Sequence, residues 1–430
     1  MTSKQEFAVV VDIGTTKITA LAGEKDESGK IVILGQAKVP SRGIKRGVVI
    51  NPEEFAGALR TLVTQLEEQV GVRIRTVDVS IAGQGIKTLA YEGVRYIESG
   101  LVSQHDVDYL ENEARNMPLD SGHKIYHLFP KNYEIGDDPS VTVPVGHEGR
   151  KMTARYTLVT APSSYQESVE KGLSRAGLEL GDCVLSPLAL SDAVISEEEK
   201  DLGVIVVDIG GGTTKMTAFS DGRLVHMAVI PFAGEVITHD IREGCSILQK
   251  WAEQLKIQYG QAMGDFAEEE KVVTIPGHNG WEPKEISFRT LAYIIQARLE
   301  EIIDSIYYQV EISGFQNQSP QGIVFTGGTS KMVNLLQLVK FRTGMDARLG
   351  FSQVKLASTP DLDKPGFLTA LGVLQGSLRN REPGRLSGTV KGKPPVEKPI
   401  TRNSGKRFLS NLGKKVSEQI SLIFEEDESN

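Results

Sequence analysis

Two stretches of the sequence decide the fold: FAVVVDIGTTKITA at residues 7–20 and VIVVDIGGGTTKMTA at residues 204–218. Each reads as a hydrophobic strand that ends in an aspartate, then a glycine turn with threonines and one lysine, then a second β-rich run. This pattern is typical of a β-hairpin with a polar tip, not of a strand that leads into a helix. Two copies of it favour the duplication of a whole domain.

The glycine turns of both stretches have the composition of a phosphate-binding site. Glycine has no Cβ, so backbone N–H groups can point at phosphate oxygens, and threonine hydroxyls add further donors. One such turn could equally be a plain tight hairpin, but two copies and a third glycine turn favour a phosphate site. The predicted donors are Gly14, Thr15 and Thr16 in the first copy, and Gly210, Gly211, Gly212, Thr213 and Thr214 in the second.

A lysine and an aspartate accompany each turn. Lys17 and Lys215 occupy equivalent places when the two stretches are aligned on their TTK residues. We expect Lys17 to reach a phosphate and Lys215 to point to solvent. Asp12 and Asp208 close the two strands, and two carboxylates would repel a polyphosphate. The sequence therefore predicts an intervening Mg2+ that is held largely through waters.

The third glycine turn is IVFTGGTS at residues 323–330, and KMVNLLQLVKFRTG at residues 331–344 is the helix that we expect it to open. A helix N-terminus offers free N–H groups to an anion. The chain has no GxxxxGK[ST], and no GxGxxG follows a strand, so P-loop and dinucleotide-binding folds are unsupported. His123 and His127 lack a Glu or Cys that would complete a zinc site.

The composition is that of a globular protein with an acidic balance. The 430 residues are 40% hydrophobic and 24% charged, with a net charge of -8. This disfavours a general nucleic-acid binder. The two cysteines, Cys183 and Cys245, cannot build a disulfide framework, which predicts a reducing compartment. The first residues read as a strand and not as a signal peptide, and we expect no membrane-spanning segment.

The C-terminal residues change character twice. Residues 385–404 contain prolines, glycines and serines without apolar periodicity, which predicts a flexible linker. Residues 405–424 regain helical periodicity, and residues 386–415 contain eight Lys or Arg and one acidic residue. A basic amphipathic helix on a linker favours an anionic membrane surface, the alternative being a helix that docks on this protein or a partner. The predicted membrane-binding residues are Phe408, Leu409, Leu412, Val416, Ile420 and Ile423, with Lys414 and Lys415 beside them.

The three glycine turns resemble the phosphate-1, phosphate-2 and adenosine elements of the actin-like ATPases. Within that superfamily, the chain is similar to the FtsA family of bacterial cell-division proteins over about residues 5–378 and again at the C-terminal helix. HLFPKNYEI at residues 127–135 resembles the small domain that is inserted in this family. The other matching segments are VVVDIGTTKI, GVIVVDIGGGTTKMTAF, GEVITHDI (234–241), AEQLKIQYG (252–260), AYIIQARLEEI (292–302), IVFTGGTSKM and TALGVLQG (369–376).

The resemblance implies an α/β actin-like ATPase fold. Its parts are two duplicated ribonuclease-H-like domains, an FtsA-type inserted small subdomain and a C-terminal amphipathic helix. The implied boundaries are 1–84, 166–202 and 366–384 for subdomain 1A, 85–165 for the inserted subdomain 1C, 203–235 and 306–365 for subdomain 2A, 236–305 for the helical subdomain 2B, 385–404 for the linker and 405–424 for the terminal helix.

The resemblance also implies ATP and Mg2+ as cofactors. Glu253 and Lys256 look like the pair that frames the ribose and adenine, although the same spacing suits a surface ion pair on a helix. Many actin-like ATPases place a Glu just before a Pro-x-Ala segment. Ser186 stands there in LSPLALSDA, which predicts firm ATP binding and at most slow hydrolysis. The remaining implied nucleotide-binding residues are Gly234, Gly327, Gly328, Thr329 and Met332.

The family implies a protein that polymerises on the inner face of the cytoplasmic membrane at the division septum and anchors FtsZ filaments there. The implied partners are the FtsZ C-terminal peptide, further copies of the chain, the anionic membrane and other division proteins, but no nucleic acid. Arg298 resembles a basic family position at the FtsZ-binding surface, and its alternative reading is a helix-surface pair with Glu301. The alternative functions are a small-molecule kinase of the superfamily, for which the chain offers no clear catalytic Asp, and a pilus-assembly relative of FtsA, in which the linker and terminal helix are not expected.

Overall fold

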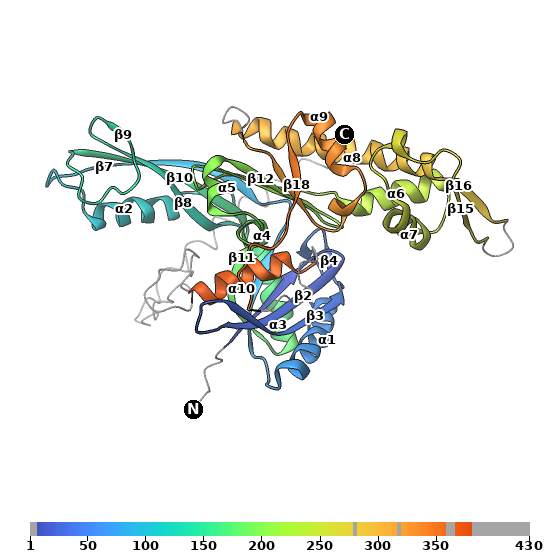
Figure 1. Cartoon of the computed structure of the whole chain (residues 1–430). Coiled ribbons are helices and arrows are strands. Elements are labelled where there is room, and N and C mark those ends of the chain that lie inside the picture. Colours follow the sequence, from blue (N-terminus) through green and yellow to red (C-terminus); the bar gives the residue numbers. More distant parts are fainter. Residues whose placement is uncertain (1–6, 278–281, 316–319, 358–365, 381–430) are drawn as a thin grey trace, which may run out of the picture. The chain divides into compact units, whose positions relative to one another are not determined.

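Two five-stranded sheets of the same topology form the framework of the computed structural model (Figure 1). The structure describes residues 7–277, 282–315, 320–357 and 366–380. The strand orders are β11-β6-β1-β2-β3 and β18-β17-β12-β13-β14. In each sheet an antiparallel three-stranded meander continues into two parallel strands. This repetition confirms the duplicated fold that the paired hairpins predict.

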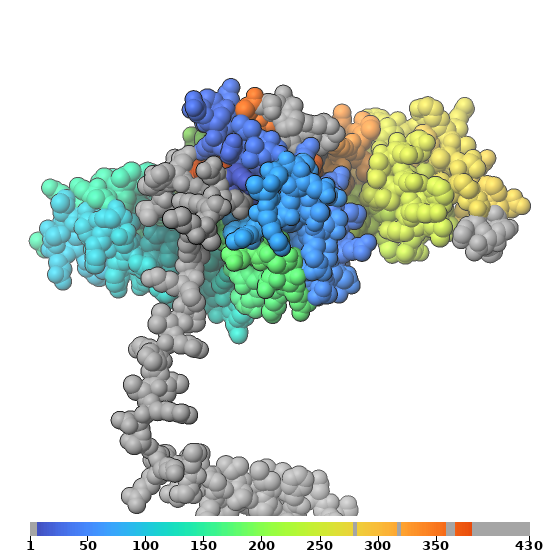
Figure 2. Space-filling model, turned by 90° about the horizontal axis from the view of Figure 1, so that it is seen from below, coloured from blue at the N-terminus to red at the C-terminus, as the bar shows by residue number. Residues whose placement is uncertain are grey.

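The first sheet and its helices make up the first half. β1 is almost entirely buried, as expected for a strand that is covered on both faces. Helices α1 and α3 pack side by side at the surface of this half (Figure 2), while α10 packs on α4 and against β1 and β2. The elements are β1 (Ala8–Ile13), β2 (Lys17–Lys25), β3 (Ile31–Pro40), β4 (Ile44–Lys45), β5 (Val48–Val49), α1 (Pro52–Val70), β6 (Thr76–Ile81), α3 (Ser163–Ala176), β11 (Glu179–Leu185), α4 (Ser186–Val194), α5 (Glu197–Leu202) and α10 (Leu368–Asn380).

The second sheet and its helices make up the second half. A buried hydrogen bond of 2.7 Å between the hydroxyls of Ser191 on α4 and Thr217 on β13 joins the two halves. Packed around it, hydrophobic residues of both halves form one continuous core cluster. The elements are β12 (Val204–Ile209), β13 (Thr214–Ser220), β14 (Arg223–Ile230), α8 (Phe288–Ile312), β17 (Ile323–Thr326), a short 3-10 helix η3 (Thr329–Lys331), α9 (Leu335–Thr343) and β18 (Ala347–Leu349).

A small domain with its own hydrophobic cluster is inserted between β6 and α3. Its four-stranded sheet has the order β7-β10-β8-β9, and α2 lies against β7. A capping box between Ser103 and Asp106 starts α2. The Arg95 side chain holds the Asp106 carboxylate at 2.5 Å. The elements are β7 (Lys87–Tyr96), α2 (Gln104–Arg115), β8 (His123–Ile135), β9 (Asp138–Val141) and β10 (Lys151–Pro162).

A helical region separates β14 from β17 along the chain. Its helices α6 and α7 pack on each other, and α6 packs on the long helix α8. The elements besides α8 are α6 (Gly234–Cys245), α7 (Gln249–Tyr259), a 3-10 turn η1 (Gly264–Phe266), β15 (Val272–Ile275) and β16 (Lys284–Ser287).

One predicted helix begins later than the sequence indicates. The helix expected at residues 331–344 is α9, which starts at Leu335, because Asn334 adopts a left-handed backbone conformation with φ of 63°. Lys331 lies instead in the 3-10 turn η3. The linker 385–404 and the terminal helix 405–424 lie outside the described residues, and the subdomain boundaries given above stay a prediction.

Candidate functional site

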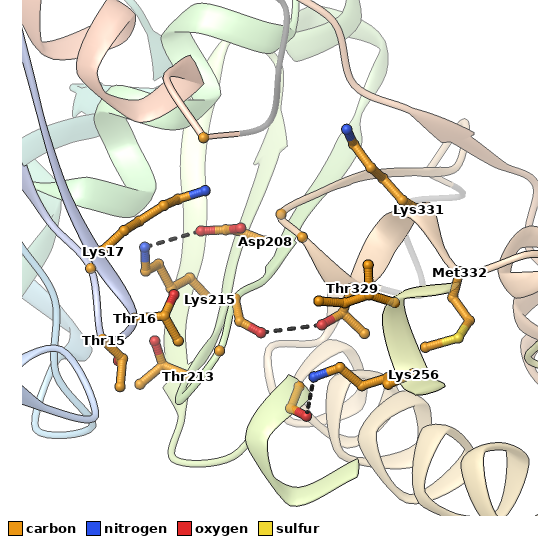
Figure 3. A pocket seen from close by; sticks show the side chains of 18 of the residues that line it. Thr15, Thr16, Lys17, Asp208, Thr213, Lys215, Lys256, Thr329, Lys331 and Met332 are labelled. Carbon is orange, nitrogen blue, oxygen red and sulfur yellow. Dashed lines mark hydrogen bonds and ion pairs between the residues drawn. The ribbon is translucent and has the colours of Figure 1, made fainter. Parts of the chain in front are cut away.

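A pocket of about 390 Å3 lies where the two glycine hairpins and the third glycine turn meet (Figure 3). It brings together most of the residues predicted from sequence. Those that line it are Asp12, Gly14, Thr15, Thr16, Lys17, Asp208, Gly210, Gly211, Thr213, Gly234, Glu253, Lys256, Gly327, Gly328, Thr329 and Met332. Gly212 is not part of this lining, and the buried Thr214 hydroxyl donates to the Phe232 carbonyl oxygen instead.

The two hairpins have the same turn but a different strand register. Gly14 N–H donates to Lys17 O, and Gly210 N–H donates to Thr213 O, both at 3.1 Å. Lys17 therefore corresponds to Thr213. The equivalence of Lys17 and Lys215 predicted from sequence is wrong, because Lys215 lies two positions further along, in β13.

Lys215 is buried at the base of the pocket and does not point to solvent, so that prediction is also wrong. Its Nζ donates to Asp208 Oδ2 at 3.0 Å, directly across the hairpin (Figure 3). Burial acts to lower the pKa of this ammonium, but the carboxylates of Asp208 and Asp12 outweigh it and leave the pKa raised. The ammonium therefore stays charged and neutralises Asp208.

The Asp12 carboxylate is less well compensated. Burial raises the pKa of this carboxyl, although the Lys215 ammonium and a 2.6 Å hydrogen bond donated by Ser80 Oγ act in the opposite direction. An additional cation near Asp12 would therefore be stabilised. Carboxylate oxygens suit Mg2+, which usually keeps several waters and takes phosphate oxygens as further ligands. Among the described residues no group of three or more His, Cys, Asp or Glu could hold a metal ion.

Side chains of the first turn pack directly on the bare backbone of the second. A Cβ atom on Gly211 would stand 2.3 Å from Thr16 Cγ2, and one on Gly212 would stand 2.6 Å from Thr15 Cγ2. Only glycine permits this approach. The hydroxyl of Thr15 also accepts a hydrogen bond of 3.0 Å from Gly47 N–H. Gly212 thus supports the turn from outside the pocket.

The third glycine turn closes over the second hairpin. Gly327 has a φ of 90°, and a Cβ there would lie 2.4 Å from Asp208 Oδ1. Thr329 Oγ1 donates to the carbonyl oxygen of Gly210 at 3.2 Å. Gly234 N–H, at the start of α6, donates to the same oxygen at 3.0 Å. The three segments therefore form one hydrogen-bonded wall.

The pair on α7 is held inside the site and is not a plain surface pair. Lys256 Nζ lies 2.7 Å from Glu253 Oε2, as the spacing predicts. It also donates to Gly234 O at 2.9 Å (Figure 3), and to Thr238 Oγ1 at 2.7 Å. Glu253 in turn accepts a hydrogen bond from the Thr238 hydroxyl. These contacts tie α7 to the N-terminus of α6 beside the pocket.

Several lining residues were not predicted from sequence. Lys331 follows the third turn and adds a cation to the pocket lining. Ile257 and Val333 line the same pocket and are largely exposed, at 71% and 55%. With Met332 they add apolar side chains to the pocket lining. The signal for Lys331 was its place directly after TGGTS; nothing in the periodicity marked Ile257.

Comparisons with known proteins agree with this geometry. Residues 205–372 match the family model "Cell division protein FtsA", and residues 83–160 match "SHS2 domain inserted in FTSA". Cell division protein FtsA of Pseudomonas aeruginosa is 33% identical over 394 residues, which cover 91% of this chain and 94% of the relative. The chain belongs to the FtsA family. FtsA of Neisseria meningitidis is 34% identical (88% and 92% covered), and FtsA of Bacillus subtilis is 30% identical (90% and 87% covered).

Solved structures confirm the actin-like fold expected of an FtsA family member. The PilM-PilN type IV pilus biogenesis complex aligns with a TM-score of 0.63 at 18% identity, and covers 87% of this chain and 99% of that chain. The MamK double helical filament aligns with a TM-score of 0.50 at 13% identity, and covers 88% and 100%. At these identities the likeness concerns the fold alone.

Two further residues expected from the FtsA resemblance lie outside the pocket. Ser186 begins α4, is buried, and has no hydrogen-bond partner for its Oγ among the described residues. It is not among the lining residues. Arg298 on α8 donates to both carboxylate oxygens of Asp240, at 2.5 and 3.1 Å, and to Glu301 at 2.5 Å. The helix-surface pair with Glu301 is thus present.

The predicted membrane-binding residues, Phe408 to Ile423, lie outside the described residues. Within the part of the chain that the structure describes, no helix is long and apolar enough to cross a bilayer.

Proposed function

We propose that this FtsA family member binds Mg-ATP in the pocket, assembles with further copies of itself, and attaches FtsZ filaments to the cytoplasmic face of the membrane at the division septum. The observation that carries the proposal is the pocket that two phosphate-type hairpins and a third glycine turn line together. Glycine turns, threonine hydroxyls and lysines that line one pocket suit a polyphosphate ligand.

The charges of the pocket suit a nucleotide polyphosphate. The lining includes three carboxylates and four ammonium groups: Asp12, Asp208, Glu253, Lys17, Lys215, Lys256 and Lys331. Lys215 and Lys256 are engaged with carboxylates. Lys17 and Lys331 come from different halves and face the same space. Backbone N–H donors from glycine turns and these two ammonium groups together stabilise an anion.

We expect Asp12→Ala to weaken Mg-ATP binding several-fold, up to about tenfold, because Asp12 is the less compensated carboxylate. Calorimetric titration of the purified protein measures this. Asp138→Ala, on the exposed strand β9, is the matched control and leaves the affinity unchanged. Unchanged Mg-ATP affinity in Asp12→Ala would contradict the metal assignment.

Nucleotide binding, more than nucleotide hydrolysis, controls the conformation of the protein in this proposal. The buried Ser186 offers no general base to a water in the pocket. ATP that contacts both halves favours the closed cleft, and closure selects an assembly-competent shape. Single-turnover hydrolysis far slower than filament assembly is the expected result, and a turnover above about 1 per second would instead favour a small-molecule kinase.

Arg298 is our candidate for contact with the acidic FtsZ C-terminal peptide. A peptide carboxylate would replace Glu301, whose side chain is 62% exposed, while Asp240 continues to orient the guanidinium. Arg298→Ala is expected to weaken binding of the FtsZ peptide about tenfold, and Glu301→Ala to leave it unchanged or stronger. Fluorescence anisotropy of a labelled peptide measures both, and equal losses in the two variants would contradict this contact.

The membrane part of the proposal rests on the sequence of residues 385–424. One amphipathic helix binds a bilayer weakly, and many copies along a filament bind it strongly through effective concentration. The test is co-sedimentation with anionic liposomes, with and without ATP and the FtsZ peptide. Deletion of residues 405–430 should abolish sedimentation, and a truncated protein that sediments equally well would overturn the membrane assignment.

A further inference from the structure

The base of the pocket contains a lysine where the equivalent position of the other half has a threonine. Lys215 faces Asp208 across the second hairpin, whereas Thr19 faces Asp12 across the first. The side chains of Lys215 and Asp208 are only 9% and 11% exposed. The second half therefore holds a buried ammonium group on the strand next to its aspartate, directly opposite the carboxylate.

We propose that the Lys215 ammonium is a built-in cation of the nucleotide site, so that Asp208 takes no part in holding Mg2+ and nucleotide binding depends only weakly on a divalent ion. This inference rests on the proposed nucleotide function and concerns how the same site meets the phosphate charge.

Both carboxylate oxygens of Asp208 already have close neighbours. Its Oδ2 accepts the 3.0 Å hydrogen bond from Lys215 Nζ. Its Oδ1 lies against the backbone of Gly327, where even a Cβ would come within 2.4 Å. A Mg2+ ligand bond is about 2.1 Å long and needs an open oxygen in a near-octahedral shell. A metal at Asp208 would have to displace an ammonium that is buried beside it.

The charges at the base of the pocket also reduce the need for a metal. Lys215 cancels the charge of Asp208, so Asp12 is the carboxylate that is left to oppose a polyphosphate at the base of the pocket. Lys17 enters from the first turn, and it lines the same pocket. Since the Lys215 ammonium already offsets the charge of Asp208, a metal ion has less repulsion between carboxylates and phosphates to offset. A buried ammonium at short range also acts in a low dielectric, where its attraction for phosphate is strong.

A purely structural role for Lys215 is the competing explanation. A lysine that only neutralised Asp208 for the sake of folding would affect the stability of the ligand-free protein. It would not change the ratio between nucleotide affinity with Mg2+ and without it. That ratio therefore separates the two roles.

The test measures the dissociation constant of ATP in Mg2+ and in EDTA by calorimetry, on the full chain. Wild type should lose about tenfold or less on removal of Mg2+, and Lys215→Thr, which reproduces the residue of the first half, about a hundredfold or more. Lys215→Arg keeps the charge and should keep the small ratio. Lys17→Thr, the matched control, should weaken binding similarly in both buffers and leave the ratio unchanged.

If Lys215→Thr does not fold, the double variant Lys215→Thr with Asp208→Asn removes the unpaired carboxylate and is expected to fold. Its ratio should lie between that of wild type and that expected for Lys215→Thr, because both the ammonium and the carboxylate that it neutralises are gone; a ratio equal to that of wild type would overturn the inference. A wild-type loss of a hundredfold in EDTA would overturn the inference and leave the nucleotide function standing. So would a Lys215→Thr ratio equal to that of wild type. Absence of ATP and ADP binding by wild type in both buffers would instead refute the proposed function itself.

Discussion

The first and second phosphate hairpins share the sequence DIG…TTK, yet they place it differently. Both turns have four residues and close with the same Gly N–H to carbonyl hydrogen bond. The second stretch has two extra glycines, and the structure absorbs them by moving TTK two positions into the strand. A shift of two residues keeps a side chain on the same face of a sheet. Lys215 therefore stays on the cleft face but moves from the turn into the core.

The two turns consequently contribute different chemistry. The first offers side chains, namely the hydroxyls of Thr15 and Thr16 and the ammonium of Lys17. The second contributes mainly backbone atoms, because Gly211 and Gly212 have no side chains and the side chains of Thr16 and Thr15 pack against them. A duplicated motif has thus become a complementary pair, and its members cannot be exchanged.

The largest expected difference between the hairpins lies in their aspartates. Asp208→Asn leaves the buried Lys215 ammonium without its partner, which should cost about 3–5 kcal/mol of unfolding free energy. Asp12→Asn removes a carboxylate whose pKa burial already raises, and keeps an acceptor for Ser80, so stability without ligand should be unchanged or higher. Chemical denaturation without nucleotide measures both. Equal losses would remove the proposed asymmetry.

The packing of one turn on the other gives the next largest effect. Gly211→Ala drives a methyl group into Thr16 Cγ2, which should wedge the turns apart and cost about 1–3 kcal/mol of nucleotide-binding free energy. Thr16→Ser removes that methyl, so the double variant should recover most of the affinity. Calorimetry with Mg-ATP tests this. A double variant as weak as Gly211→Ala would show that the contact is not the cause.

The smallest effect is expected at the residue equivalent to Lys215. The Thr19 hydroxyl is buried and has no hydrogen-bond partner among the described residues. Thr19→Val should therefore leave the unfolding free energy within about 1 kcal/mol of wild type or raise it slightly, with ATP affinity unchanged. Thermal melts with and without ATP check this, and a large loss of affinity would indicate a hidden polar role for Thr19.

The sequence predicted the hairpins, the duplication and most of the pocket lining, because glycine turns after hydrophobic strands have few other structures. It did not predict the role of Lys215, since residue type and spacing do not reveal hydrogen-bond register. The late start of α9 depends on the left-handed Asn334, a conformation that apolar periodicity does not report.

The inserted domain is connected to the first half, after β6 and before α3, and it also forms hydrogen bonds with the second half. Met227 N–H on β14 donates to Thr88 Oγ1 on β7 at 2.9 Å, and Thr88 donates back to Met227 O at 3.0 Å. Strands β8 and β10 also touch β14. The inserted domain is therefore covalently connected to the first half and hydrogen-bonded to the second half. A rotation of one half relative to the other must either bend the two connections of the inserted domain or break the hydrogen bonds between Thr88 and Met227. A protein bound to the inserted domain would therefore affect the opening of the nucleotide pocket.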